Sequence, residues 1–150
     1  MYRRILVAFD GSPIAEHALH EALTLAKDSQ ASVRVVYAVD VLFSGLGEAY
    51  VDIEAFRRDC LQAGRKILDQ AADLARQAGV DVETALLEVE GSRFSNAIVA
   101  EARRWPAELI VVGSHGRGGL LHLLMGSVAE RVVRHAPVPV LLVRGVDAPA

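Results

Sequence analysis

The chain is poor in cysteine, lysine and aromatic residues. Cys60 is the one cysteine among 150 residues, so no disulfide can form within the chain, which favours a reducing compartment. Aromatic residues make up 5% of the sequence, so a core has to be built from alanine and the branched aliphatic residues. The two lysines, Lys27 and Lys66, both lie away from the glycine-rich segment near the C-terminus, which excludes a P-loop.

Long apolar runs and an excess of charge of one sign are also lacking. The apolar run at residues 5–9 is too short for a signal peptide, and no run reaches the length of a membrane span. The formal net charge is −3, with both signs interspersed, which argues against a nucleic-acid partner. We therefore expect one soluble, cytoplasmic domain over residues 1–150 that binds neither nucleic acid nor a membrane.

Two hydrophobic periods alternate along the chain. Short continuous apolar runs predict buried strands, and apolar residues at helical spacing predict helices between them. The predicted strands are 5–9, 33–39, 80–89, 109–112 and 138–144, and the predicted helices are 13–26, 53–78, 93–104 and 127–135. Alternation of this kind is typical of an α/β fold with a parallel sheet and helices on both faces.

Some local features refine this pattern. Ser12 and Ser92 are candidate N-caps of the first and third helices, and Gly79 fits the end of the second. Cys60 is expected to pack in the core from the long helix. Residues 40–52 have no clear hydrophobic period, so we expect a loop. Two interpretations stay open with equal weight: a flap over a bound ligand, or a connection without a function of its own.

The candidate chemistry lies in two loops that follow strands. In open α/β sheets, ligands bind beyond the carboxyl ends of the strands, where the strand order reverses. Asp10 follows the first strand, and a glycine-rich segment, residues 113–126, follows the fourth. Glycines let backbone N–H groups converge on an anion, and a helix that begins at Ser127 favours phosphate at its first turn. The alternative is that the glycines only make a tight turn and a close approach of helix to sheet.

The glycine segment carries a recognisable pattern. Gly113-x-x-Gly116, nine further residues, and Gly126-Ser127 resemble the G-x-x-G-x9-G-[S/T] signature of the universal stress protein family. The opening run to Asp10-Gly11-Ser12 and the ending at residues 135–144 are similar to that family too. The resemblance covers residues 2–144.

The resemblance implies a fold and a ligand. It implies a five-stranded parallel sheet of order 3-2-1-4-5 flanked by four helices, and ATP binding with Mg²⁺ held mainly by the phosphates. Carried over by position, it places adenine and ribose against Ala8, Phe9, Asp10 and Val39. It places ribose and phosphates near Gly113, His115, Gly116, Arg117, Gly126, Ser127 and Val128. It predicts no catalytic residue and no metal ligand from the protein.

One position departs from the family, and other functions stay open. His122 stands where many members carry a basic residue. The main interpretation is a nucleotide-dependent stress-response module with at most slow ATP hydrolysis. The alternatives are an interaction module that does not use the nucleotide site, and a nucleotide hydrolase or transferase on a related fold. A phosphoacceptor domain is set aside, because no lysine follows Lys66.

The last predicted strand combines prolines with an apolar middle. Prolines mark the strand that begins at Val138 and ends at Arg144 as an edge, yet its middle is apolar, which predicts a homodimer through this strand. The resemblance points to the same dimer, and a further protein partner is left unidentified. His17 and His20 make a weak metal pair. The arginine pairs 57–58 and 103–104 are interpreted as solvated helix faces.

Overall fold

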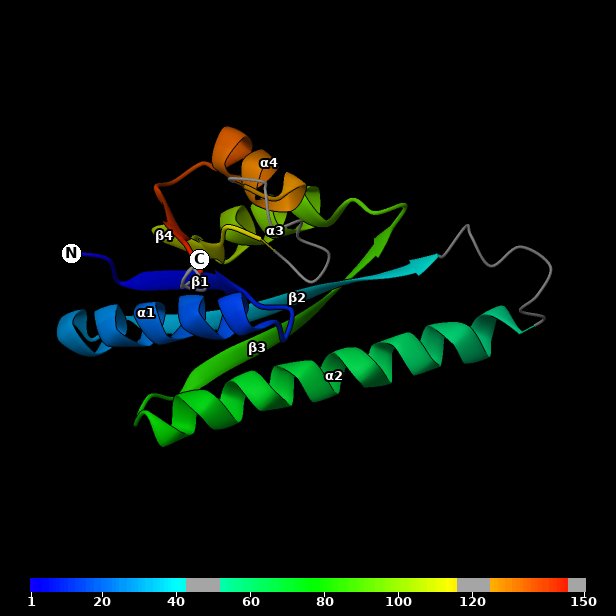
Figure 1. The fold of residues 1–150 in the computed structure, drawn as a ribbon, viewed down its shortest axis with the longest axis horizontal. Coiled ribbons are helices and arrows are strands. Elements are labelled where there is room, and N and C mark those ends of the chain that lie inside the picture. Colours follow the sequence, from blue (N-terminus) through cyan, green and yellow to red (C-terminus); the bar gives the residue numbers. More distant parts are fainter. Residues whose placement is uncertain (43–51, 116–124, 146–150) are drawn as a thin grey trace, which may run out of the picture.

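The structure, a computed structural model, describes residues 1–42, 52–115 and 125–145. Strands and helices alternate along it (Figure 1). Their order is β1 (Arg4–Ala8), α1 (Pro13–Ser29), β2 (Ser32–Leu42), α2 (Ile53–Gln77), β3 (Val82–Glu90), α3 (Phe94–Arg104), β4 (Leu109–Gly113), α4 (Ser127–His135) and β5 (Val140–Val143). The alternation predicted from hydrophobic periodicity is confirmed.

The strands form one parallel sheet with β1 at its centre. The strand order is β3-β2-β1-β4-β5, which confirms the expected order. Ile5 of β1 pairs with Val33 of β2 on one side and with Leu109 of β4 on the other. Helices cover both faces of the sheet, so Ile5, Leu6 and Val7 of this central strand are fully buried, as the sequence indicated.

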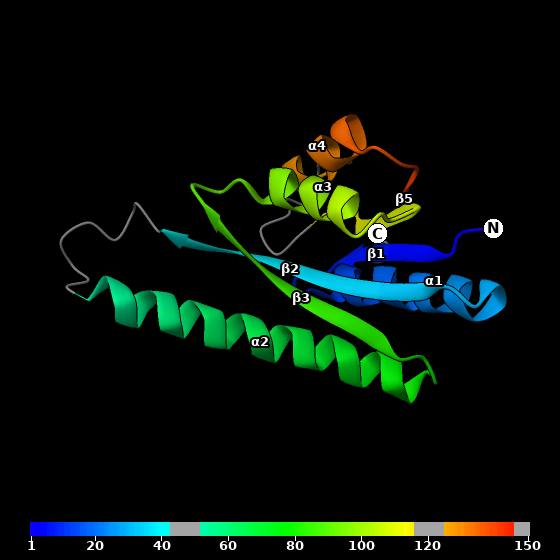
Figure 2. The same ribbon diagram turned by 180° about the vertical axis from the view of Figure 1, so that it is seen from behind.

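The two faces of the sheet are covered by different helices. Successive side chains of β1 point to opposite faces. Ile5, Val7 and Phe9 pack in a cluster with residues of α1 and α2, whereas Leu6 packs in a second cluster with Ile98 of α3 and others from that face. Figure 2, seen from behind, shows α3 and α4 together and away from α2. The core is therefore two clusters separated by the sheet.

The helix ends of the first half mostly follow the sequence signals. The hydroxyl of Ser12 accepts a hydrogen bond from the Ala15 N–H at 3.2 Å, so Ser12 caps α1 as predicted. Gly79, at φ 79°, ends α2. The Val80 N–H donates to the Ala75 carbonyl at 2.9 Å in this turn. Val80 thus belongs to the helix end, so β3 begins at Val82 and not at residue 80.

The predicted cap of the third helix is wrong. The N-cap position of α3 is Arg93, without a side-chain cap, and the helix begins at Phe94. Ser92 lies one residue earlier, at φ 61°, in a turn with Gly91. Its N–H donates to the Asp40 carboxylate at 3.2 Å. Ser92 therefore ties the end of β3 to β2 and leaves the first turn of α3 uncapped by a side chain.

The expected loop at residues 40–52 is wrong at its ends. Residues 40–42 continue β2, because β3 runs alongside them and pairs Asp40 with Val89. Asp52 is the N-cap of α2, and its side chain accepts from the Ala55 N–H at 3.0 Å. Residues 43–51, which include Phe43 and Tyr50, lie outside the described residues, so the flap stays a prediction.

The last strand is shorter than predicted. β5 spans Val140–Val143 and lies at the edge of the sheet, as expected from its prolines. Pro139 precedes the strand, and its carbonyl accepts from the Ile110 N–H at 3.0 Å. Within the described part of the chain, no helix has the length and apolar character that crossing a membrane requires.

Cys60 is half-buried rather than part of the core. The residues of α2 that are buried against the sheet recur three and four apart, and Cys60 lies beside this stripe. They are Leu61, Gly64, Leu68, Ala71 and Ala75. Burial raises the pKa of the Cys60 thiol, and the negative charges of Asp59 and Asp40 raise it further.

Candidate functional site

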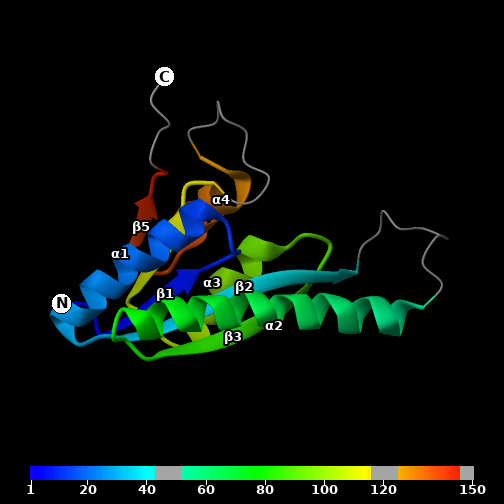
Figure 3. The same cartoon turned by 60° about the horizontal axis from the view of Figure 1, so that its bottom comes forward.

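The candidate site lies where β1 and β4 end side by side. Val7 of β1 pairs with Val111 of β4. The two neighbouring strands are parallel, so their carboxyl ends lie side by side and the chain leaves the sheet there twice. After β1 it enters α1 on one face, and after β4 it continues to α4 on the other face (Figure 3). The strand order reverses at this point, which is where open α/β sheets leave a crevice for ligands.

The turn after β1 holds a carboxylate at this edge. The Phe9 N–H donates to the Val36 carbonyl at 2.9 Å, which extends the pairing with β2, and the Phe9 side chain is buried in the core. Asp10 is half-buried, and its Oδ1 accepts from the Ser12 N–H at 2.9 Å. Gly11 turns the chain at φ 82°. The Asp10 carboxylate is thus oriented by the backbone that follows it.

The end of β4 is tightly packed. A Cβ on Gly113 would lie 3.3 Å from two side-chain carbons of Ile14, so the missing side chain lets α1 approach the sheet closely. The Ser114 N–H donates to the Val143 carbonyl at 2.8 Å. The Ser114 hydroxyl lies 3.0 Å from Nδ1 of His115. Gly113 therefore allows the close approach of helix to sheet that the sequence offered as the alternative to anion binding.

The start of α4 is held against the end of β4. The Gly126 N–H donates to the Ser114 carbonyl, so the chain returns to β4 at residue 126. Gly126 is the N-cap of α4, and since glycine has no side chain, the N-cap residue makes no side-chain hydrogen bond to the helix. Ser127 is exposed and Val128 is half-buried against the second core cluster. The first N–H groups of a helix carry partial positive charge, so this end favours an anion.

Two of the other predicted residues lie in strands, and two lie outside the described part of the chain. Ala8 ends β1. Val39, expected at the end of the second strand, lies inside β2, which continues to Leu42. Gly116 and Arg117 lie outside the described residues, as does His122. Within the residues described, no three or more His, Cys, Asp or Glu side chains form a group that could hold a metal ion.

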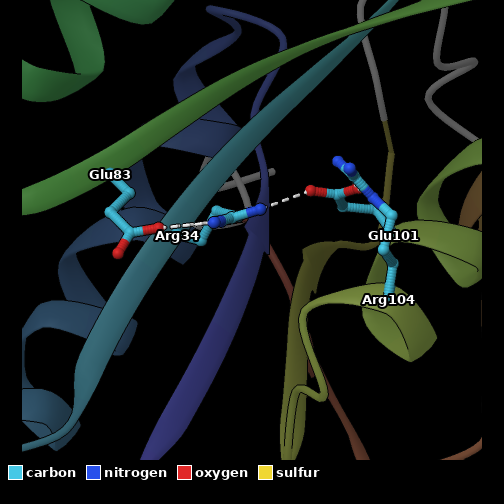
Figure 4. A network of polar contacts seen from close by, with 4 residues as sticks. All are labelled: Arg34, Glu83, Glu101 and Arg104. Atoms are coloured by element: carbon cyan, nitrogen blue, oxygen red, sulfur yellow. Dashed lines mark hydrogen bonds and ion pairs between the residues drawn. The ribbon is translucent and has the colours of Figure 1, made fainter.

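The α3 face carries a charged network that the predictions from sequence do not include (Figure 4). The Arg34 guanidinium of β2 donates to Glu101 at 2.7 Å and to Glu83 at 2.6 Å. Arg104 also donates to Glu101, at 2.6 Å. Glu101 is 3% exposed, and Arg34 lies 5.1 Å from the ring centroid of Trp105. Arg104 is exposed, as predicted, and it also takes part in this ion-pair network.

A signal for this network was present in the sequence. Arg34 interrupts the apolar run of the second strand, and a charged residue in a strand with neighbours on both edges needs a charged partner. The acidic residues that alternate along the third strand supply one candidate. Glu101 could not be singled out, because its pairing depends on how α3 lies over the sheet.

The comparisons with known proteins identify the family of this chain. The family model described as the Universal stress protein family matches residues 1–144. The chain belongs to this family. A universal stress protein of Methanocaldococcus jannaschii is 37% identical over 145 residues, which cover 96% of this chain and 83% of that protein. A universal stress protein of Bacillus subtilis is 36% identical over 151 residues, which cover 96% of this chain and 100% of that protein.

Solved structures of universal stress proteins share the fold. A family member from Burkholderia pseudomallei is 39% identical, with a TM-score of 0.75 and coverage of 95% of this chain and 96% of that one. An Archaeoglobus fulgidus protein solved in complex with dAMP is 27% identical, with a TM-score of 0.71 over 95% and 98% of the two chains. A universal stress protein solved in complex with cAMP is 28% identical, with a TM-score of 0.69 over 95% and 97%.

Proposed function

We propose that this universal stress protein binds ATP in the crevice between the ends of β1 and β4 and acts as a nucleotide-dependent stress-response module. One observation carries the proposal. The hydrogen bond from Gly126 to Ser114 fixes the start of α4, whose N-cap is a glycine, beside the end of β4, next to the turn where Asp10 follows β1. An anion-binding helix end and an oriented carboxylate then flank the same crevice.

Each group has a distinct task in this proposal. The Asp10 carboxylate accepts hydrogen bonds from the ribose hydroxyls, and the backbone near Ala8, Phe9 and Val39 lies against the adenine. The first N–H groups of α4 and the Ser127 hydroxyl donate to phosphate oxygens. We assign phosphate contacts to Val128 as well, and contacts with ribose or phosphate to Gly113, His115, Gly116 and Arg117. The phosphates rather than protein side chains hold Mg²⁺, because metal ions of this kind are commonly bound through substrate phosphates.

The choice of ligand has two supports. Two solved relatives are complexes with dAMP and cAMP, which supports an adenine nucleotide. The full glycine signature, Gly113-x-x-Gly116-x9-Gly126-Ser127, supports ATP over a monophosphate, because two glycine groups offer more donors for a phosphate chain. We propose at most slow hydrolysis, since no lysine follows the glycine segment to reach the terminal phosphates.

A homodimer belongs to the same proposal. Val140, Leu141 and Leu142 in the edge strand β5 are half-buried in the single chain, and pairing with a second copy would cover them. The exposed edge also favours a second candidate function, an interaction module that leaves the nucleotide crevice unused and binds an unidentified protein. We place the protein in the cytoplasm, on the basis of its single cysteine.

Nucleotide release and binding test the proposal. The purified protein is denatured before and after incubation with Mg-ATP, and released nucleotides are identified by chromatography with mass detection. We expect stoichiometric ATP or ADP. Recovery of neither nucleotide, before or after loading, would refute ATP binding and favour the interaction module.

Two variants locate the site by titration calorimetry with Mg-ATP. Asp10→Asn keeps an oxygen for the Ser12 N–H but removes the charge, and we expect affinity to fall about tenfold. Asp81→Asn is the same change in the exposed turn before β3 and should leave affinity unchanged. Equal affinities of the two variants would contradict the role of Asp10.

A further inference from the structure

A groove lies between α3 and α4, apart from the crevice described above. It has a volume of about 280 Å³ and is lined by Ser95, Asn96, Val99 and Arg103 of α3 and by Arg131 and His135 of α4. Ser95, Val99 and Arg103 are four residues apart and so share one side of α3, as Arg131 and His135 do on α4. The lining extends from Ser95 to Arg103, so the groove runs along α3.

The cationic side chains of this groove lack acidic partners in the described part of the chain. Arg103, Arg131 and His135 are exposed, and none of them forms an ion pair there. The acids on these two helices are engaged elsewhere: Glu101 with Arg34 and Arg104, and Glu130 with Arg134 at 2.9 Å. A protein with a formal net charge of −3 thus leaves a cluster of uncompensated positive charge at one place.

The floor of the groove carries a second, independent feature. Ser95 is 5% exposed, and no described residue makes a hydrogen bond with its hydroxyl. No fully enclosed side-chain polar atom in the described residues lacks a partner, so the Ser95 oxygen is reached through the groove. A hydroxyl that opens onto a groove and has no partner among the described residues can hydrogen-bond to a molecule bound there. Val99, 5% exposed, is the apolar part of the floor.

We propose that this groove binds a small phosphorylated molecule. Its phosphate is held by the guanidinium groups of Arg103 and Arg131 with His135, and its polar end reaches Ser95 and Asn96 over the side chain of Val99. Guanidinium groups match phosphate in shape and charge. Ser95 and Arg103 are eight residues apart, about 12 Å along a helix, which sets the length of the ligand. This site does not depend on nucleotide binding at β1 and β4.

The size of the groove favours a small molecule over a peptide. Its volume of about 280 Å³ is near the lower end of small-molecule sites. A helical peptide in a groove needs a row of apolar anchor pockets, whereas this floor offers one apolar side chain, Val99. Every polar side chain of the lining carries at least one hydrogen-bond donor, which suits an oxyanion.

Amide chemical-shift mapping tests the proposal, with ribose 5-phosphate as the probe and ribose as the uncharged control. We expect saturable shifts for ribose 5-phosphate centred on residues 95–103 and 131–135, and none for ribose. Shifts that arise only around Asp10, Gly113 and Ser127 would place the probe in the other crevice and overturn the proposal. The same shifts with ribose, or equal affinity for inorganic phosphate, would also overturn it.

A pair of matched variants tests the charges. The double variant Arg103→Gln/Arg131→Gln should weaken ribose 5-phosphate binding by about tenfold or more. The control Arg58→Gln/Arg65→Gln changes two exposed arginines of α2 that make no ion pair with a described residue, so it removes the same number of charges. Ser95→Ala tests the floor and should weaken binding with a smaller effect. If Arg103→Gln/Arg131→Gln binds ribose 5-phosphate as tightly as Arg58→Gln/Arg65→Gln, the site is refuted.

Discussion

Replacing Glu101 by glutamine tests whether the network around Arg34 stabilises the fold. The carboxylate of Glu101 is 3% exposed and accepts hydrogen bonds from both Arg34 and Arg104. Glutamine has nearly the same size, but it is neutral and offers one amide nitrogen where an acceptor is needed. That nitrogen would face guanidinium donors, so at least one buried hydrogen bond is lost.

The expected cost follows from the exposure of the partners. Removing one member of a fully buried ion pair costs about 3–5 kcal/mol. Here Arg34 keeps Glu83, and its side chain is 22% exposed, while that of Arg104 is 73% exposed. After the substitution, Arg34 therefore stays paired with Glu83, and Arg104 stays hydrated by solvent. We expect Glu101→Gln to lower the free energy of unfolding by about 2–3 kcal/mol.

The assay is urea unfolding followed by circular dichroism at one fixed protein concentration, since a dimer would make stability depend on concentration. Glu130→Gln is the control, because the Glu130–Arg134 pair is exposed on α4 and should contribute only about 0.3–0.5 kcal/mol. The variant Arg34→Met/Glu101→Met should recover much of the loss, since apolar residues can replace a buried pair. Equal effects of Glu101→Gln and Glu130→Gln would refute the reasoning.

Three further predictions concern single positions. Gly79→Ala should destabilise the protein by about 1 kcal/mol in urea unfolding, because φ is 79° at the end of α2; no loss would contradict the left-handed conformation. Gly113→Ala should cost about 1–3 kcal/mol, since its Cβ would lie 3.3 Å from Ile14, and Ile14→Ala should relieve part of this cost; the same cost in both backgrounds would argue against this contact. Cys60 should react with iodoacetamide more slowly in the folded than in the unfolded protein near neutral pH, because its pKa is raised by burial and then by Asp59 and Asp40. Equal rates would contradict that shift.

Hydrophobic periodicity was enough to predict the strands and helices, because each of them buries one stripe or run of apolar residues. The cap at Ser12 and the stop at Gly79 were predictable because they depend on neighbours in the sequence. Ser92 was mistaken for a cap because its N–H bonds to Asp40, which is distant in the chain. The extension of β2 to Leu42 likewise depends on β3 alongside it.

For the candidate site too, the features that follow from the order of elements could be predicted, and those that depend on packing could not. The positions of Asp10 and Gly126 beyond their strands follow from the order of elements, so the sequence could place both at one edge. The hydrogen bond from Gly126 to Ser114 and the contact of Gly113 with Ile14 could not be predicted, since they depend on how the elements pack. The groove between α3 and α4 was missed because its charged residues come from two helices that only the fold brings together.

The separation of the core into two clusters has a consequence for synthesis on the ribosome. β1, β2 and β3 are neighbours in the sheet and all precede residue 91, so they can pair before β4 exists. At that stage α1 and α2 can cover one face of the sheet. Leu6 and Val36 on the other face are not yet covered, because α3 and α4 have not been synthesised. Arg34 would then lack Glu101. A nascent chain that pauses after β3 would present a half-covered sheet to the cell.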